Sequence, residues 1–130
     1  MRHDADRQSD PGAAPVRERT QSSTIVEIRT TFGDRAAAEA CAARLVNDRL
    51  AACAQVDGPI TSTYRWRGAV ETAAEWRCIC KTTPARAGDC RAALVAGHSY
   101  ELPEIVESRV EAAPAYAAWV RESVGDTGPP

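Results

Sequence analysis

The chain has 130 residues and a formal net charge of −2, with acidic and basic residues interspersed along it. This length is typical of one domain. Proteins that bind nucleic acid or an anionic membrane through charge carry a basic stripe, and this sequence has none, so we expect neither partner. Apolar runs fall short of the roughly 20 residues of a membrane span, and no signal-peptide core follows Arg2, which makes the cytoplasm the expected compartment.

The apolar residues of this chain are mostly small. Alanine occurs 25 times, whereas Leu, Ile and Phe together occur ten times. One subunit therefore has little large apolar surface to bury, and small domains with thin cores often gain stability from a partner. The five cysteines form an odd number without a secretory signal, which argues against a disulfide framework and favours reduced thiols.

Both ends of the chain lack the periodicity of packed structure. Residues 1–23 contain prolines, glycine and mixed charges, and Val16 is their only sizeable aliphatic side chain. Residues 123–130 end in Gly-Pro-Pro, which interrupts both helix and strand. Such segments bury too little surface to offset the entropy of ordering, so we predict two disordered tails around one domain at residues 24–122.

The domain begins with a predicted strand over residues 24–31, in which Val26 and Ile28 share one face. Asp34 then suits an N-cap, because its carboxylate can accept the unpaired amides of a first helical turn. The Ala-rich run behind it predicts a helix to about Leu50. The buried stripe of that helix would comprise Ala37, Cys41 and Leu45.

A long β-hairpin is the central prediction. A short buried strand at residues 51–56 leads into a Gly-Pro pair at 58–59, which indicates a bulge or bend because proline donates no ladder hydrogen bond. Residues 60–67 and 75–82 are typical of the two arms, and Gly68 can take the positive φ of the turn between them. In the second arm, one face is formed by Trp76, Cys78 and Cys80.

A second helix is predicted from Pro84 to Ala96 with Gly97 as its C-cap. After a loop, a fourth strand is expected over residues 105–110 and a short helix over residues 115–120. The order β-α-β-β-α-β is that of the ferredoxin-like α+β fold, with one antiparallel sheet and both main helices on one face. We therefore expect this fold with a long central hairpin and a short C-terminal helix.

One loop concentrates polar side chains of the kinds that bind metals. It contains His98, Tyr100, Glu101 and Glu104, and Pro103 stiffens it. A neutral imidazole and carboxylates can bind a divalent cation, but one histidine and two flexible acids do not define a closed site. The alternative is that these groups hydrogen-bond the loop across a subunit boundary, and the ligand count favours that alternative.

The cysteines are expected to divide between packing and chemistry. A single residue separates Cys78 from Cys80, so a strand places both sulfurs side by side on one face. Redox and zinc motifs instead have two cysteines spaced around a turn, which this spacing does not allow. A buried free cysteine behaves as a small hydrophobe, and core packing is the role expected for Cys41, Cys78 and Cys90. Cys53 lies close to the loops, and both roles stay open for it.

The sequence offers little to an enzyme. No nucleophile-elbow or phosphate-loop pattern surrounds its Ser, Thr or Cys residues, and His98 is the only histidine outside the predicted N-terminal tail. A Cys53–His98 pair brought together in space is left open without support. We expect a protein that is not an enzyme and has no organic cofactor.

Trp66 and Trp76 are expected to cap the hairpin or face a partner chain, with stacking on a ligand as the alternative.

Several separated motifs occur in a specific order and spacing between residues 24 and 119. They are Leu50-Ala-Ala-Cys53, Ser62-x-Tyr64-x-Trp66-x-Gly68, Lys81-Thr82, His98-x-Tyr100-Glu101-x-Pro103-Glu104-Ile105 and Tyr116-x-x-Trp119. With this set the chain resembles the CutA divalent-cation tolerance family. Any one of the motifs alone would be a weak signal.

The resemblance implies a ferredoxin-like subunit in a tight homotrimer, similar in architecture to the PII nitrogen-regulatory proteins, with hairpin edges pairing between subunits. An exposed strand edge is a liability unless it is paired, which agrees with this expectation. The resemblance also implies cytosolic tolerance of copper or another divalent cation, with binding in clefts between subunits near His98. In animals the family is linked instead to anchoring or processing of a membrane enzyme.

Some positions depart from copper-associated members of the family. Where those can have a cysteine at the end of the first strand and a second histidine in front of the loop histidine, this chain has Arg29 and Gly97, and Ser99 stands at a usual proline. Arg29 is a fixed cation and cannot replace a thiolate, so a metal at His98 would need other ligands. The candidates are Glu101, Glu104 and Cys53. The implied ligand cleft would further involve Arg29, Tyr64, Trp66, Lys81 and Tyr100.

Three functions follow as hypotheses. The leading one is a non-enzymatic, cytosolic trimer that weakly binds copper, another divalent cation or a small ligand between subunits. The second is a PII-like signalling or scaffold trimer whose loop is structural and whose partner is a protein or a small anion, which Arg29 would favour. The third is an enzyme that uses Cys53 with His98.

Overall fold

The computed structural model describes residues 22–126, so most of the two predicted tails lies outside the described residues. Its elements follow the predicted order. They are β1 (Thr24–Phe32), α2 (Arg35–Asn47), β2 (Cys53–Trp66), β3 (Ala69–Thr82), α3 (Pro84–Gly97), β4 (Val106–Glu111) and α4 (Pro114–Ser123).

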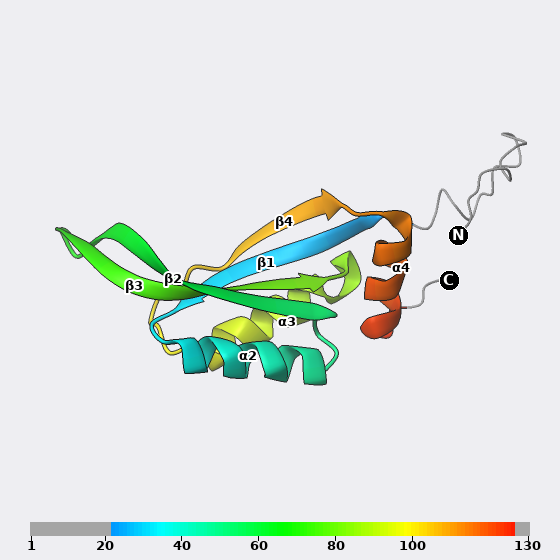
Figure 1. The fold of residues 1–130 in the computed structure, drawn as a ribbon, viewed down its shortest axis with the longest axis horizontal. Coiled ribbons are helices and arrows are strands. Elements are labelled where there is room, and N and C mark those ends of the chain that lie inside the picture. Colours follow the sequence, from blue (N-terminus) through cyan, green and yellow to red (C-terminus); the bar gives the residue numbers. More distant parts are fainter. Residues whose placement is uncertain (1–21, 127–130) are drawn as a thin grey trace, which may run out of the picture.

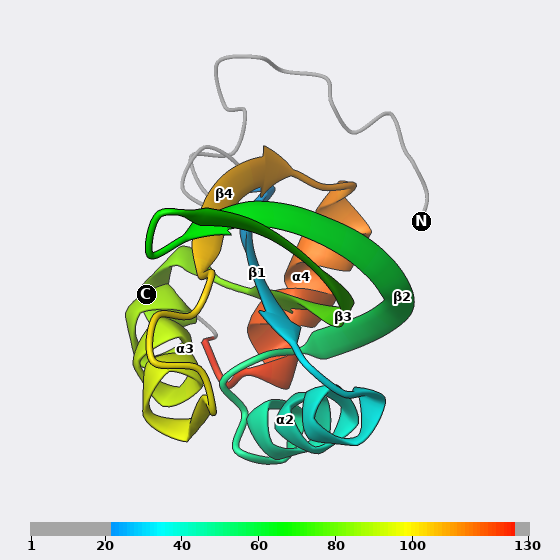
Figure 2. The same ribbon diagram turned by 90° about the vertical axis from the view of Figure 1, so that its left-hand side faces the viewer.

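The strands within residues 22–126 form one antiparallel sheet in the order β2-β3-β1-β4. Helices α2 and α3 cover the same face of this sheet, and α4 lies at the end opposite to the hairpin tip (Figures 1 and 2). This is the ferredoxin-like α+β arrangement, so the predicted fold class is confirmed. In the described part of the chain, every helix is too short or too polar to span a membrane.

The two main helices begin where local chemistry predicts. The Asp34 side chain accepts a 2.8 Å hydrogen bond from the Ala37 amide at the start of α2. Thr83 accepts from the Arg86 amide at 3.2 Å, and Pro84 takes the first position of α3, where no amide is needed. The first helix ends earlier than predicted, because Arg49 adopts φ 58° and the Leu50 amide turns back to the Leu45 carbonyl.

Gly97 is not the C-cap that the sequence predicts. It is the last helical residue of α3, and His98 is the cap, with an extended backbone at φ −83° and ψ 144°. A Cβ atom at position 97 would lie 2.5 Å from Nη2 of Arg44 on α2. The glycine therefore allows the close approach of an arginine side chain and leaves the capping position to His98.

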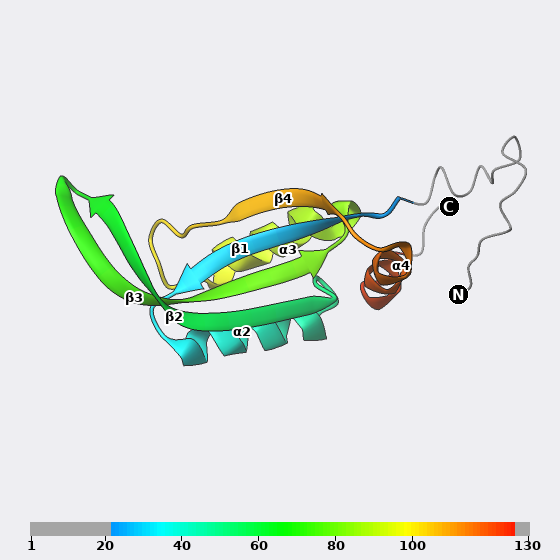
Figure 3. The ribbon, with the colours of Figure 1, turned by 45° about the horizontal axis from the view of Figure 1, so that its top comes forward.

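The central hairpin is longer and more continuous than predicted. β2 runs through both expected stretches with a register shift between Asp57 and Ile60, which confirms the irregularity at the Gly-Pro pair. Arg67 and Gly68 form the turn with φ values of 51° and 84°, the two positive angles that a two-residue hairpin turn of right-handed twist requires. The second arm begins at Ala69, so the tip projects beyond the rest of the sheet (Figure 3).

Two apolar clusters hold the elements together. The larger lies between the sheet and helices α2 and α3, and its buried members include Val26 and Ile28 from β1. The second forms where Ile25, on the opposite face of β1, meets α4. Val124 is fully buried in this second cluster, so packing continues past the domain boundary expected at residue 122.

Candidate functional site

His98 is held by both of its ring nitrogens. Its Nδ1 accepts a 3.0 Å hydrogen bond from the Tyr100 amide, so the proton of the neutral ring is on Nε2. Nε2 lies 2.9 Å from the Thr31 carbonyl, to which it donates, and 3.0 Å from the Thr30 hydroxyl. The ring stacks on Phe32 at a centroid distance of 4.3 Å. Burial, the main cause, lowers the pKa of His98 and favours this neutral form.

Tyr100 fastens the same loop to the hairpin. Its hydroxyl donates a 2.7 Å hydrogen bond to Oε2 of Glu75, a β3 carboxylate whose residue is only 8 % exposed. Burial and then the neighbouring Glu75 carboxylate raise the pKa of Tyr100, because both disfavour the phenolate. The loop is thus tied to β1 through His98 and to β3 through Tyr100.

A cleft of about 760 Å³ opens between this loop and the projecting hairpin. Aromatic rings from both sides form part of its wall, namely Tyr64, Trp66 and Tyr100. Four carboxylates also line it, namely Glu71, Glu75, Glu101 and Glu104, whereas its lining contains no lysine or arginine. Arg67, which is not part of the lining, pairs with Glu101 at 3.3 Å in an exposed position. The cleft therefore has an acidic interior.

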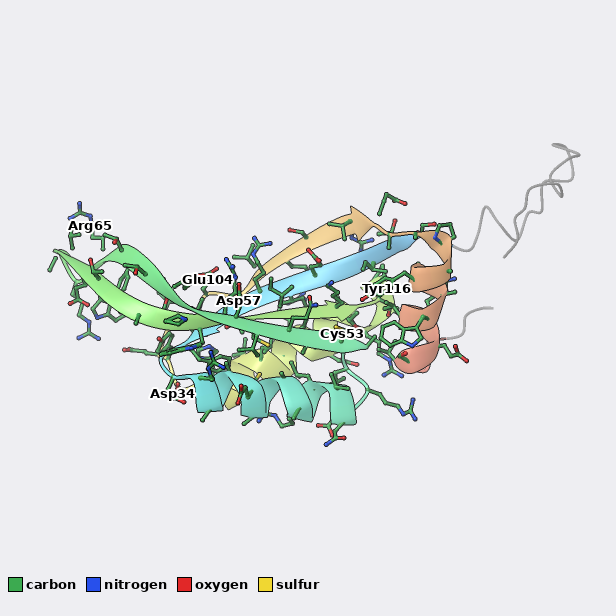
Figure 4. All side chains as sticks on the ribbon, in the orientation of Figure 1. Asp34, Cys53, Asp57, Arg65, Glu104 and Tyr116 are labelled. Carbon is green, nitrogen blue, oxygen red and sulfur yellow. The ribbon has the colours of Figure 1, made fainter. Side chains whose placement is uncertain are left out.

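The structure brings only part of the predicted site together. Five of the predicted residues line the cleft, namely Tyr64, Trp66, Tyr100, Glu101 and Glu104. His98 is in contact with Tyr100 but is not part of the lining. Cys53 begins β2 at the end away from the hairpin tip, where it pairs with Lys81, and Figure 4 shows it far from Glu104.

Arg29 and Lys81 also lie outside the cleft. Arg29 sits in β1 between Ile79 of β3 and Val106 of β4. The Lys81 ammonium lies 5.8 Å from the centre of the Tyr116 ring, near α4. In residues 22–126, no group of three or more His, Cys, Asp or Glu side chains is arranged to hold a metal ion. That His98, Glu101, Glu104 and Cys53 bind a metal ion together stays a prediction.

Glu71 and Glu75 are the acidic cleft residues that the sequence did not point to. The predicted second arm started at residue 75, whereas β3 starts at Ala69 and carries both acids along the cleft. Residues 71, 73 and 75 point to one face of an extended strand. The signal that would have found them is this two-residue alternation next to the turn at Gly68.

A ferredoxin-like sheet with a projecting hairpin, and a loop fastened to β1 and β3, defines a small α+β fold with a cleft at one end. The chain belongs to the family described as CutA1 divalent ion tolerance protein, whose sequence profile matches residues 26–123.

Individual relatives agree with this assignment. A probable divalent-cation tolerance protein cutA homolog of Encephalitozoon cuniculi is 34% identical over 102 residues, covering 78% of this chain and 89% of that protein. The crystal structure of CutA from Xylella fastidiosa superimposes with a TM-score of 0.75 at 34% identity and covers 77% of this chain and 97% of that one. The periplasmic divalent cation tolerance protein CutA from Archaeoglobus fulgidus has a TM-score of 0.73 at 32% identity, with 77% and 98% covered.

Proposed function

We propose that this protein is a non-enzymatic homotrimer whose acidic clefts weakly bind copper or another divalent cation at the subunit boundaries. The observation that carries the proposal is the charge of the cleft, which is lined by four carboxylates and no basic side chain. Like charges in a partly closed space raise the local concentration of a cation and repel an anion. Carboxylate oxygens also suit hard and borderline divalent cations.

The sheet edge supports the trimer. In the described residues β2 is paired only on its β3 side, so a 14-residue strand presents unpaired backbone groups. Natural proteins cover or pair such an edge, and edge-to-edge contact with another subunit does so. Val70 of the hairpin and Leu102 of the loop are more than half exposed beside the cleft and would be covered by a neighbouring subunit.

A second candidate is a PII-like signalling or scaffold trimer without a metal site. The bonding of His98 favours it, because both ring nitrogens are used within the subunit and the loop is thereby structural. The version of this candidate whose partner is a small anion has less support, because Arg29 lies outside the cleft lining. A protein partner at Leu102 and Val70 is the form of this candidate that the exposed side chains favour.

Calorimetric titration of Zn(II), Cu(II) and, under reducing conditions, Cu(I) into the full chain tests the proposal. We expect saturable binding near one cation per subunit and a solution mass of three subunits. Combining Glu71→Gln with Glu104→Gln should weaken binding at least about tenfold, which is about 1.4 kcal/mol. Glu39→Gln on the exposed side of α2 is the matched control and should leave affinity within about twofold. His98→Ala is compared in parallel.

Equal affinities in the cleft variant and the Glu39 control would refute the site, and the absence of saturable heat would refute cation binding. Binding of inorganic phosphate that Arg29→Ala abolishes would support the second candidate instead.

We place the protein in the cytoplasm. The five free thiols support this proposal, because reduced cysteines persist in a reducing compartment. The relative from Archaeoglobus fulgidus is described as periplasmic, which makes that compartment the alternative. Cell fractionation of the source organism distinguishes the two.

A further inference from the structure

Four thiols come together inside the main core. They are supplied by three elements, with Cys41 on α2, Cys78 and Cys80 on β3, and Cys90 on α3, and we call them the sulfur row. They make up four of the twelve buried residues of the larger cluster, and none is more than 3 % exposed. Packing by itself does not require sulfur at these positions, since aliphatic side chains fill such space.

Two thiols of the sulfur row are in direct contact. The Sγ atoms of Cys78 and Cys80 are 3.9 Å apart on one face of β3. Cys41 of α2 and Cys90 of α3 are buried in the same cluster, so the row continues into both helices. Hydrogen bonding to Cys78 and burial raise the pKa of Cys41 and of Cys80, so these two thiols are protonated at neutral pH.

The geometry restricts the kind of cation that this row can hold. Since the described chain offers no set of three or more metal-binding side chains in suitable positions, a zinc-like site with four ligands is not formed. Two sulfurs suffice for a soft cation that prefers two thiolates. With metal–sulfur bonds of about 2.3 Å, the two sulfurs of a linear S–metal–S unit are about 4.6 Å apart. The sulfurs of Cys78 and Cys80 are 3.9 Å apart, so a small side-chain rotation would bring them to that separation.

Charge restricts the cation further. Burying a net charge in an apolar core is costly. A monovalent cation with two thiolates leaves one negative charge, whereas a divalent cation with two thiolates is neutral. Around Cys78 and Cys80 lie apolar residues of the main core, including Ile28 opposite Cys80, together with the buried and uncharged Thr30 opposite Cys78. A soft divalent cation is therefore the class that this environment accepts.

We propose that Cys78 and Cys80 form a buried two-coordinate binding site for a soft divalent cation of the Hg(II) class. In the binding step two S–H bonds break, two metal–sulfur bonds form, two protons pass to solvent and the chloride or water ligands of the cation leave, with no change in oxidation state. The cation enters through local opening of α2 or α3. The site uses no cleft residue, so it stands independently of the proposed function.

Mercuric chloride titrated into the reduced full chain, in the Cys53→Ser background, tests this site. That background removes the one cysteine outside the row and leaves Cys78 and Cys80 intact. We expect one Hg(II) per chain by native mass spectrometry, retained against one equivalent of a competing thiol, with ultraviolet sulfur-to-metal absorption and release of two protons. The melting temperature should rise, because a cation held by the native core stabilises the fold.

Substitution within the row assigns the ligands. Adding Cys78→Val should abolish uptake, whereas adding Cys41→Val should retain it, and circular dichroism before titration verifies that each variant is folded. Valine is close to cysteine in size and suits both positions in the core. Adding Glu71→Gln should leave mercury uptake unchanged, which separates this site from the cleft.

Retention by the Cys78→Val variant would overturn the ligand assignment. A melting temperature that falls on addition of Hg(II), or uptake only in denaturant, would overturn the native site, since the cation would then be binding the unfolded chain.

Discussion

The Tyr100 hydroxyl donates a 2.7 Å hydrogen bond to the Glu75 carboxylate and so joins the loop after α3 to the hairpin across the base of the acidic cleft. The two residues are 25 positions apart in the sequence. Because Glu75 is buried, its carboxylate depends on this partner for one of its oxygens. The shape of the cleft therefore depends on a contact that also contributes to stability.

Replacing Tyr100 by Phe should lower the free energy of unfolding by about 1 to 3 kcal/mol, because it leaves a buried carboxylate oxygen without its donor. Urea denaturation measures the change. Tyr116→Phe, at a ring that packs on Trp119, is the matched control and should change stability by less than about 0.5 kcal/mol. A loss for Tyr100→Phe as small as the one expected for the control would show that the hydroxyl of Tyr100 does not stabilise the fold.

His98 should make stability depend on pH. Burial lowers its pKa in the folded chain below the usual value of 6.5, so below that value the unfolded chain binds more protons. The stabilisation is present above pH 6.5 and is lost as pH falls through the folded pKa, which makes the free energy of unfolding decrease on acidification. Urea denaturation at several values between about pH 7 and pH 5 measures this slope.

His98→Gln should flatten that slope, because glutamine keeps a donor and an acceptor without titrating. His3→Gln removes the other histidine of the chain and is the matched control. A slope unchanged by His98→Gln, or removed by His3→Gln, would contradict the assignment to His98.

Gly58→Ala should destabilise the protein by about 2 to 4 kcal/mol, because backbone strain and a steric clash add. Gly58 has φ 150°, and an added Cβ would lie 2.7 Å from Cδ1 of Trp76 and 2.9 Å from the Glu75 carbonyl oxygen. Gly68→Ala is the control, since φ is 84° there and no atom lies within 4 Å. Gly68→Ala introduces backbone strain without a clash, so it should lower the free energy of unfolding by about 1 kcal/mol. Guanidinium denaturation measures the stability of both variants. Equal losses of stability would exclude a contribution from the clash at residue 58.

Cys53 should be the only described cysteine that reacts rapidly with a thiol reagent in the native protein. It is half-buried, whereas the four cysteines of the sulfur row are buried. Reactivity requires access and a thiolate, and both are restricted in the core. Thiol counting should give about one fast group in the native chain and five in denaturant. A Cys53→Ser chain that still shows a fast thiol would contradict this burial.

The fold was predictable because its signals are local. Asp34 caps α2, Pro84 begins α3 and Gly68 forms the turn, and each acts through atoms a few residues away. Gly97 shows the limit of such signals. A glycine at this position suggests a helix cap, whereas in the structure it allows Arg44 of another helix to approach closely. No local sequence pattern encodes the distance between these two residues.

The candidate site was predictable only in part. The loop residues Tyr100, Glu101 and Glu104 were identified as a group because they are neighbours in the sequence. Glu71 and Glu75 join them through the curvature and register of the hairpin, which are set by the pairing of β2 with β3. Cys53, suggested as a further ligand, begins β2 at the end opposite to the hairpin tip.

By itself, the sequence determined the order of the elements, the family and the polar loop, because periodicity, capping and motif spacing are properties of short segments. Only the tertiary structure decided that His98 has both ring nitrogens bonded, that four carboxylates share one cleft and that four thiols are buried in one core. These arrangements depend on distances between residues far apart in the chain. Such distances are set when the sheet, its hairpin and its helices pack together.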